Sequence, residues 1–237
     1  MQNLVIKIVS TFVVVQTAIF FISAILLFIV AASVYLRAPK ALLNKIFGLA
    51  YTQFGLAGFS FGLSNIPIIL WEVPGLIPLS KLAYSFLMLG LIIFLISALT
   101  IEYGFELTMR PLYLGPILCV LIANLIIIWL FPDSIYHPGE LGDIHTSLLF
   151  KVVYFCSLAT VYFLTLFLYF KTFKSSKEEI IKNNMRWFLL GWLIGGFLLV
   201  TGALSDFIRV LDLAGYPLLA AAGFIQRQAF RKKEEEK

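Results

Sequence analysis

Long uncharged apolar runs alternate with short polar segments along the whole chain. Six of these runs hold 19 or more residues without Asp, Glu, Lys or Arg: 8–36, 46–71, 82–101, 111–132, 152–170 and 187–205. At 1.5 Å per residue, a helix of about 20 residues crosses the roughly 30 Å hydrocarbon core of a bilayer. A seventh run, 213–226, has only 14 residues and reaches that length only if its helix begins near Phe207.

The pattern predicts an all-α integral membrane protein, in which residues 1–230 form one seven-helix bundle and 231–237 form a charged cytoplasmic tail. The expected spans are about 8–36, 46–70, 80–101, 111–132, 148–171, 186–205 and 207–227. Composition agrees, since 61% of residues are hydrophobic and 13% are charged, against about a quarter charged in soluble domains. We expect a multi-pass protein of the cell membrane whose first partner is the lipid bilayer.

Basic residues divide unequally between alternate loops, which predicts the orientation. Fourteen of the 18 fall on one side: Arg37, Lys40, Lys45, Arg110, Lys171, Lys174, Lys177, Lys182, Arg186, Arg227, Arg231, Lys232, Lys233 and Lys237. The positive-inside rule places this side in the cytoplasm. The N-terminus is then outside and the C-terminus inside, which requires an odd number of spans. The net charge of +5 reflects topology and anionic lipid, so no nucleic-acid partner is expected.

Small residues four positions apart predict where helices pack closely. Gly58 and Gly62 have this spacing in the second run, and Gly191 and Gly195 in the sixth. Such pairs let two helix backbones approach each other. We expect the second and sixth helices in the crowded middle of the bundle, and the first and third facing more lipid.

Polar side chains in the second run suggest an alternative to close helix packing, namely a polar ligand cleft. Gln53, Ser60 and Asn65 interrupt an otherwise apolar or small-residue helix, and together they could line a ligand cleft. Packing remains the preferred interpretation of this run.

Charged residues at the outer end of the seventh helix form the first candidate ligand site. If this helix must include 207–212 to cross the bilayer, Asp206, Arg209 and Asp212 lie at or just below the outer surface. Ionisable groups at that depth face a wet cavity or one another. Arg209 therefore either pairs with a neighbouring Asp, or binds an anionic group in a pocket that Trp71 and Glu72 also line.

A second candidate site lies at the cytoplasmic end of the third helix. Glu102, Glu106 and Arg110 are spaced by four, which puts all three on one face of a continuous helix. Glu106 can pair with Arg110, and the acidic face can meet the basic segment 171–186. The alternative is a docking site for a partner protein.

Nothing in the chain resembles a catalytic or cofactor-binding motif. We find no nucleophile with a neighbouring His, no HExxH and no Gly-rich phosphate loop, so neither an enzyme nor a cofactor is expected. The seventh run lacks a Lys for a retinal Schiff base. One outer loop holds five possible metal ligands at irregular spacing, Asp133, His137, Glu140, Asp143 and His145, and we expect no metal there.

Two stretches resemble a known family. Residues 36–50 (LRAPKALLNKIFGLA) form a short basic turn that leads into a small-residue-rich helix, and 184–191 (NMRWFLLG) with 201–206 (TGALSD) mark the sixth span. This pattern resembles the seven-helix membrane input region of many prokaryotic sensor histidine kinases and diguanylate cyclases. In that family the seventh helix leads into a cytoplasmic signalling domain, whereas this sequence ends at Lys237.

The resemblance implies a non-enzymatic, ligand-responsive sensor module without its own output domain, which passes its signal to a separate chain. The competing hypothesis is an accessory subunit of a larger membrane complex, with an obligate protein partner. A third hypothesis is a small transporter. It rests on a weak repeat, 44–47 against 184–187, which suggests a duplication of three helices on either side of a linker helix.

Overall fold

The computed structural model describes residues 2–71, 75–131, 134–136, 145–197, 201 and 210–230. The helices are α1 (Gln2–Arg37), α2 (Leu42–Trp71), α3 (Ile77–Tyr103), α4 (Phe105–Thr108), α5 (Pro111–Leu130), α6 (Leu148–Ser175), α7 (Glu179–Gly195) and α9 (Val210–Gln226), with a 3₁₀ helix η1 (Arg227–Phe230). Strands β1 (Ile135–Tyr136) and β2 (His145–Thr146) pair antiparallel, with Ile135 opposite Thr146. The all-α prediction is confirmed.

Among the described residues, five helices are long and apolar enough to cross a membrane: residues Thr11–Arg37 of α1, then α2, α3, α5 and α6. The sixth and seventh predicted spans overlap α7 and α9, which have 17 residues each. The described part of each is about 26 Å long, and residues 198–200 and 202–209 of these predicted spans lie outside the described residues. Several membrane spans are thus supported, whereas the count of seven and the orientation remain predictions.

Helix ends follow local sequence signals. Pro39 lies in the turn between α1 and α2, where the Ala41 amide donates to the Ala38 carbonyl (2.9 Å), and proline suits the second position of such a turn. Asn44 Nδ2 then donates to the Val34 carbonyl (2.8 Å), which satisfies one of the free carbonyls at the end of α1. Ser147 caps α6 by accepting from the Phe150 amide (3.2 Å).

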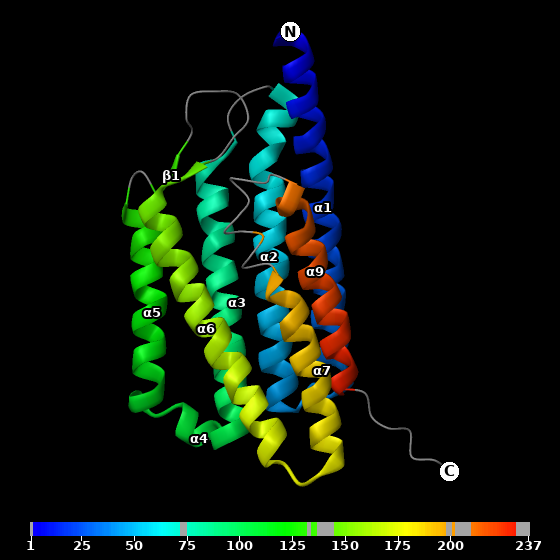
Figure 1. Ribbon diagram of the computed structural model, residues 1–237, viewed down its shortest axis with the longest axis vertical. Helices are drawn as coiled ribbons and strands as arrows, with labels where there is room; N and C mark the ends of the chain where they lie inside the picture. Colours follow the sequence, from blue (N-terminus) through cyan, green and yellow to red (C-terminus); the bar gives the residue numbers. More distant parts are fainter. Residues whose placement is uncertain are drawn as a thin grey trace, which may run out of the picture.

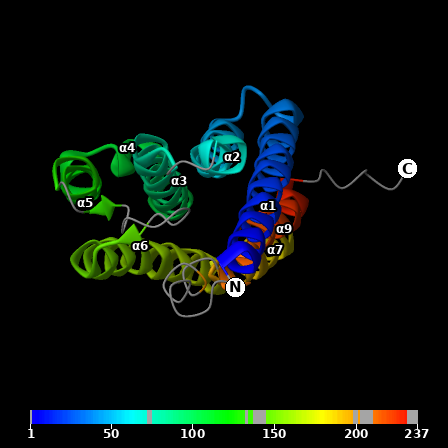
Figure 2. The same cartoon turned by 90° about the horizontal axis from the view of Figure 1, so that it is seen from above.

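The helices form a closed ring with one helix outside it. Contacts join α1 to α2, α2 to α3, α3 to α6, α6 to α7, α7 to α9 and α9 back to α1, while α5 contacts α3, α6 and the short α4. Figure 2 shows α1, α9 and α7 together at one end and α5 at the other. Chain order divides this ring into two three-helix groups, α1–α2–α3 and α6–α7–α9, and α5 lies beside the seam between α3 and α6.

The third helix is not the lipid-facing helix that we expected. In the most apolar part of α3, 67% of residues are buried, against 39% in α1 and 17% in α5. Six consecutive residues of α3, 90–95, are buried, because α2 and α6 cover it from different sides. A helix that is apolar all round carries no stripe to show which face is covered, and this is why the prediction was wrong for α3.

Connections with basic residues meet at one end of the bundle. The α1–α2 turn, the α4 region, the α6–α7 connection and η1 lie at the lower end in Figure 1, and the β-ribbon lies at the upper end. Arg37 Nη1 donates to the Arg227 carbonyl (3.0 Å) at the lower end. The helix directions therefore agree with the segregation of charge that the sequence shows.

This arrangement makes the orientation testable by cysteine labelling. With Cys119 and Cys156 replaced by serine, we expect Lys40→Cys and Lys177→Cys to react with a membrane-impermeant maleimide only after cells are permeabilised. Tyr136→Cys, at the opposite end, is expected to react in intact cells. All three positions are exposed. The reverse labelling pattern would invert the predicted topology.

Candidate functional site

The outer charged site remains a prediction. Glu72, Asp206 and Arg209 lie outside the described residues. Trp71 ends α2 with 65% of its surface exposed, and Asp212 lies in the first turn of α9. Of the five possible metal ligands in the outer loop, where we expect no metal, only the backbone of His145 is described, in β2.

The cytoplasmic acidic face does not have the predicted geometry. Gly104 takes a φ of 85°, a left-handed conformation that glycine adopts without strain. It ends α3 and starts α4, so Glu102 and Glu106 belong to different helices. Glu106 and Arg110 are both exposed and form no ion pair with each other. The prediction of one continuous face was wrong because the glycine interrupts the helix.

Glu102 instead holds α3 to α6. Its carboxylate pairs with Lys171 Nζ (2.8 Å) and accepts from the Thr172 hydroxyl (2.7 Å). Lys171 also donates to the Tyr103 hydroxyl (3.2 Å). The acidic end of the third helix thus meets the start of the basic segment 171–186, which was the intramolecular alternative. Nothing in the structure tests a partner at this place.

We expect this ion pair to contribute little to stability. Lys171 keeps 43% of its side chain exposed, and pairs of that kind are worth up to about 1 kcal/mol. Glu102→Gln should lower the melting temperature by a few degrees at low salt and less at high salt. Glu106→Gln is the matched control and should leave the melting temperature unchanged at both salt concentrations. A large, salt-independent loss in Glu102→Gln would show that Glu102 has a structural role beyond this pair.

The packing glycines lie where helices approach each other. A Cβ atom at Gly58 would lie 3.1 Å from the Tyr216 ring, and one at Gly62 would lie 2.9 Å from the Phe21 ring. At Gly191 it would lie 2.2 Å from Cγ of Gln226, and at Gly195 3.5 Å from Cβ of Ala222. Gly191 therefore has no room for a methyl group, Gly58 and Gly62 would each require an aromatic ring to shift, and Gly195 has room.

A small cavity lies between the two three-helix groups. Its volume is about 30 Å³, enough for one or two waters or a few heavy atoms of a ligand. Side chains from α2, α3, α6, α7 and α9 line it: Tyr51, Phe54, Leu91, Phe94, Tyr162, Gly191, Trp192, Gly195, Leu219, Ala222 and Gln226. Among the residues that the structure describes, neither Gln53, Ser60 nor Asn65 belongs to the lining.

A buried hydrogen bond crosses from one helix group to the other beside this cavity. The Tyr51 hydroxyl of α2 donates to Oε1 of Gln226 in α9, and Nε2 of Gln226 donates to the Phe188 carbonyl of α7 (3.2 Å). Tyr51 and Gln226 are 1% and 4% exposed. The absence of a side chain at Gly191 leaves the space that Gln226 occupies.

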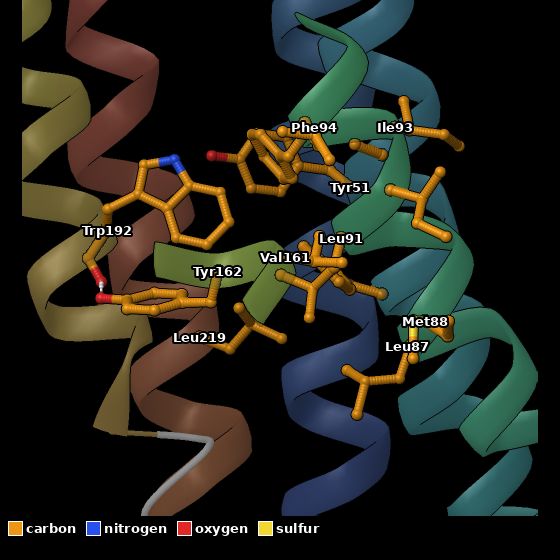
Figure 3. Packing of buried hydrophobic residues seen from close by; sticks show 14 of the residues in the cluster. Tyr51, Leu87, Met88, Leu91, Ile93, Phe94, Val161, Tyr162, Trp192 and Leu219 are labelled. Carbon is orange, nitrogen blue, oxygen red and sulfur yellow. Dashed lines mark hydrogen bonds between the residues drawn. The ribbon is translucent and has the colours of Figure 1, made fainter. Parts of the chain in front are cut away.

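Aromatic rings surround the cavity and carry its remaining polar atoms. Trp192 packs edge-on against Phe94 and Tyr162, with distances between ring centroids of 5.2 Å and 5.0 Å. The Tyr162 hydroxyl donates to the Trp192 carbonyl (2.6 Å), as Figure 3 shows. The buried side chain of Trp192 also interacts with the Tyr169 hydroxyl of α6, so its indole N–H is not a free donor for the cavity.

Sequence reasoning missed the cavity, although one signal was available. Gln226 is a polar residue at the end of the seventh apolar run, and Gly191 was singled out for packing. Their proximity depends on how α7 and α9 are placed, which neither spacing nor hydropathy specifies.

Fold and cavity together define a multi-span α-helical membrane protein with a small cavity lined by α2, α3, α6, α7 and α9. Comparison with models of known protein families and with curated proteins finds no match. The resemblance to sensor input regions therefore remains an expectation.

Proposed function

We propose that the protein is a ligand-responsive membrane module of the sensor type, and that a ligand in the central cavity changes the contact between its two helix groups. The observation that carries the proposal is the cavity itself, lined from five helices and crossed by the Tyr51–Gln226 hydrogen bond. A ligand shifts a conformational equilibrium only through different contacts in the two states. A site shared between two groups of helices provides such a difference.

The two seams between the helix groups differ in their polar contacts. On the α3–α6 side, Tyr169 lies 2.8 Å from the Ser97 hydroxyl, Tyr154 donates to the Tyr84 carbonyl (2.7 Å), and Glu102 binds α6. On the other side, Tyr51 to Gln226 and Arg37 to the Arg227 carbonyl are the corresponding bonds. We expect the α3–α6 contacts to persist, so that the contact between the two groups changes mainly where α7 and α9 meet α1 and α2.

Gentle extraction followed by native mass spectrometry tests this function. The expected species is one 26.7 kDa chain with a small molecule bound. Leu219→Phe narrows the cavity and should abolish that adduct, whereas Leu218→Phe, a neighbouring position outside the lining, should retain it. Spin labels at Lys40→Cys and Lys177→Cys should report a changed distance when the molecule is removed by dialysis. An unchanged distance would contradict a sensor.

A second candidate function is transport, because the helix contacts have the symmetry that a duplication predicts. If α1, α2 and α3 correspond to α6, α7 and α9, the symmetry that relates the two repeats maps the α3–α6 contact onto the α9–α1 contact. Both contacts are present. Corresponding helices also run in the same direction (Figure 1). Substrate sites of repeat-built transporters lie between the repeats, as this cavity does.

Transport and subunit functions give different results in the same preparation. Reconstituted vesicles that accumulate the co-purified molecule would favour the transporter. A stoichiometric protein partner with no small molecule would favour the accessory subunit. A separate signalling chain as that partner would instead support the sensor.

A further inference from the structure

The polar side chains around the cavity already have polar partners. Four of the eleven lining residues carry a polar side-chain group: Tyr51, Tyr162, Trp192 and Gln226. Tyr51 donates to Gln226, Gln226 donates to the Phe188 carbonyl, and Tyr162 donates to the Trp192 carbonyl. The Trp192 side chain interacts with the Tyr169 hydroxyl. The surface that faces the cavity is therefore almost wholly apolar.

An apolar wall of this kind disfavours water and ions. A buried water makes about three hydrogen bonds to polar groups that need them, and apolar cavities stay dry. An ion would lose its hydration without meeting an opposite charge, since no lining residue is charged. A hydrocarbon group has no hydrogen bonds to lose, and it gains dispersion contacts with the wall. Hydrocarbon is therefore the chemistry that the cavity favours.

Both helix groups contribute to the apolar wall. Phe54 of α2 and Phe94 of α3 belong to one group, and Leu219 and Ala222 of α9 belong to the other. Figure 3 shows Phe94 and Leu91 on one side and Leu219 on the other. An occupant therefore contacts both groups at once, and its binding depends on how far apart they lie.

Size limits which part of a ligand can enter. A cavity of about 30 Å³ holds a group of few heavy atoms. A whole molecule of that size binds only weakly, because each heavy atom supplies a limited free energy of binding. The cavity is partly open, so a longer molecule can place one end in it and continue outside.

From these observations, and resting on the proposed function, we propose that the cavity is a water-free site that binds the compact hydrocarbon end of a lipid-soluble ligand. A methyl or ethyl group of the ligand packs against Phe94, Leu91 and Leu219, and the rest of the molecule extends beyond the cavity. A polar group at that end is rejected, because it would be buried without a hydrogen bond. Selectivity for the end of the ligand thus comes from shape and from the absence of polar partners.

Ethane and methanol form a matched pair of probes, since they have the same number of heavy atoms and only methanol carries a hydroxyl. The protein, labelled with ¹³C at its leucine methyl groups, is placed in lipid nanodiscs, and Leu219→Ile identifies the Leu219 signals. We expect ethane to shift these signals and to saturate them with a Kd of about 5 mM, as the binding energy per atom of small ligands allows. Methanol should bind about tenfold more weakly or worse, because its hydroxyl finds no partner. Leu193, which is 57% exposed on α7, should shift without saturation as ethane dissolves in the lipid.

Gly195→Ala connects binding to the space inside the cavity. Gly195 belongs to the lining, and a methyl group there meets Ala222 and Leu219 at 3.5 Å and 3.9 Å, so the variant should fold and fill part of the site. We expect ethane affinity to fall about fivefold or more, since a guest beside the added methyl group is overpacked. Gly115→Ala, at a position of α5 with no neighbouring group within 4 Å, should keep the affinity. Unmoved Leu219 signals, methanol binding as tightly as ethane, or undiminished affinity in Gly195→Ala would overturn the proposal.

Failure of this inference and failure of the proposed function are distinguishable. If ethane saturates the Leu219 signals but the spin-label distance between the two connections does not change when the co-purified molecule is removed, the hydrocarbon site stands and the sensor function is wrong. If native mass spectrometry finds a molecule without a hydrocarbon end whose binding Leu219→Phe abolishes, and the spin-label distance changes on its removal, the function stands and the ligand class is wrong.

Discussion

Gly191→Ala is expected to destabilise the protein by about 3 kcal/mol, while Gly195→Ala, one turn further along α7, is expected to be neutral or slightly stabilising. A methyl group at 191 would lie 2.2 Å from Cγ of Gln226 and 2.9 Å from the Ala222 carbonyl oxygen. Neither distance is tolerated, so α7 and α9 must separate or Gln226 must leave its place. Overpacking costs about 1–3 kcal/mol, and loss of the buried bond to Tyr51 adds about 1 kcal/mol.

Gly195 provides the control because the helix and the type of substitution are the same. A methyl group there would make ordinary contacts of 3.5 Å with Ala222 and 3.9 Å with Leu219. Alanine also favours a helix by up to about 1 kcal/mol over glycine. SDS titration in mixed micelles measures the free energy of unfolding of the Gly191→Ala and Gly195→Ala variants. Equal effects at the two positions would show that α7 and α9 do not pack as described.

A double variant separates the two clashes at Gly191. Gly191→Ala combined with Gln226→Ala removes the side-chain conflict and leaves the one with the Ala222 carbonyl. We expect partial recovery relative to Gly191→Ala. Full recovery would mean that the α7 and α9 backbones have room to adjust, whereas no recovery would assign the whole cost to the backbone contact.

Hydropathy predicted the helices because a membrane-spanning helix depends mainly on the length and apolar character of its own segment. The run 111–132 corresponds to α5 (Pro111–Leu130), and Pro111 suits the first turn of a helix, where its missing N–H is not needed. The same locality explains the error at the cytoplasmic end of α3. Spacing by four assumes a continuous helix, and Gly104 ends it between Glu102 and Glu106.

Helix neighbours were less predictable, since lipid and protein both accept apolar side chains. The apolar residues of α3 gave no sign that α2 and α6 enclose it. The glycines pointed to close approach, but the partner at Gly191 is Gln226, 35 positions further along the chain. The outer charges drew attention because charge near a membrane is rare, whereas Tyr51 is one of ten tyrosines and has no pattern that distinguishes it.

The second large effect is expected at the hydrogen bond between α2 and α9. Tyr51→Phe leaves Oε1 of Gln226 buried without its donor, and Gln226→Met leaves the Tyr51 hydroxyl without its acceptor. Each change should cost about 1–3 kcal/mol, the range for a buried polar group that loses its partner. Tyr35→Phe, at a tyrosine of α1 that is 45% exposed, should have almost no effect.

The double variant shows whether the bond couples the two helix groups. If it does, Tyr51→Phe with Gln226→Met should cost less than the sum of the single changes, because the second change removes a group that the first left unsatisfied. Coupling within membrane proteins averages about 0.6 kcal/mol and reaches about 1.7 kcal/mol. We expect the upper part of that range, since both groups are almost completely buried. Strict additivity would mean that the hydroxyl and the amide act separately, and a ligand could then not use this bond to move α9 relative to α2.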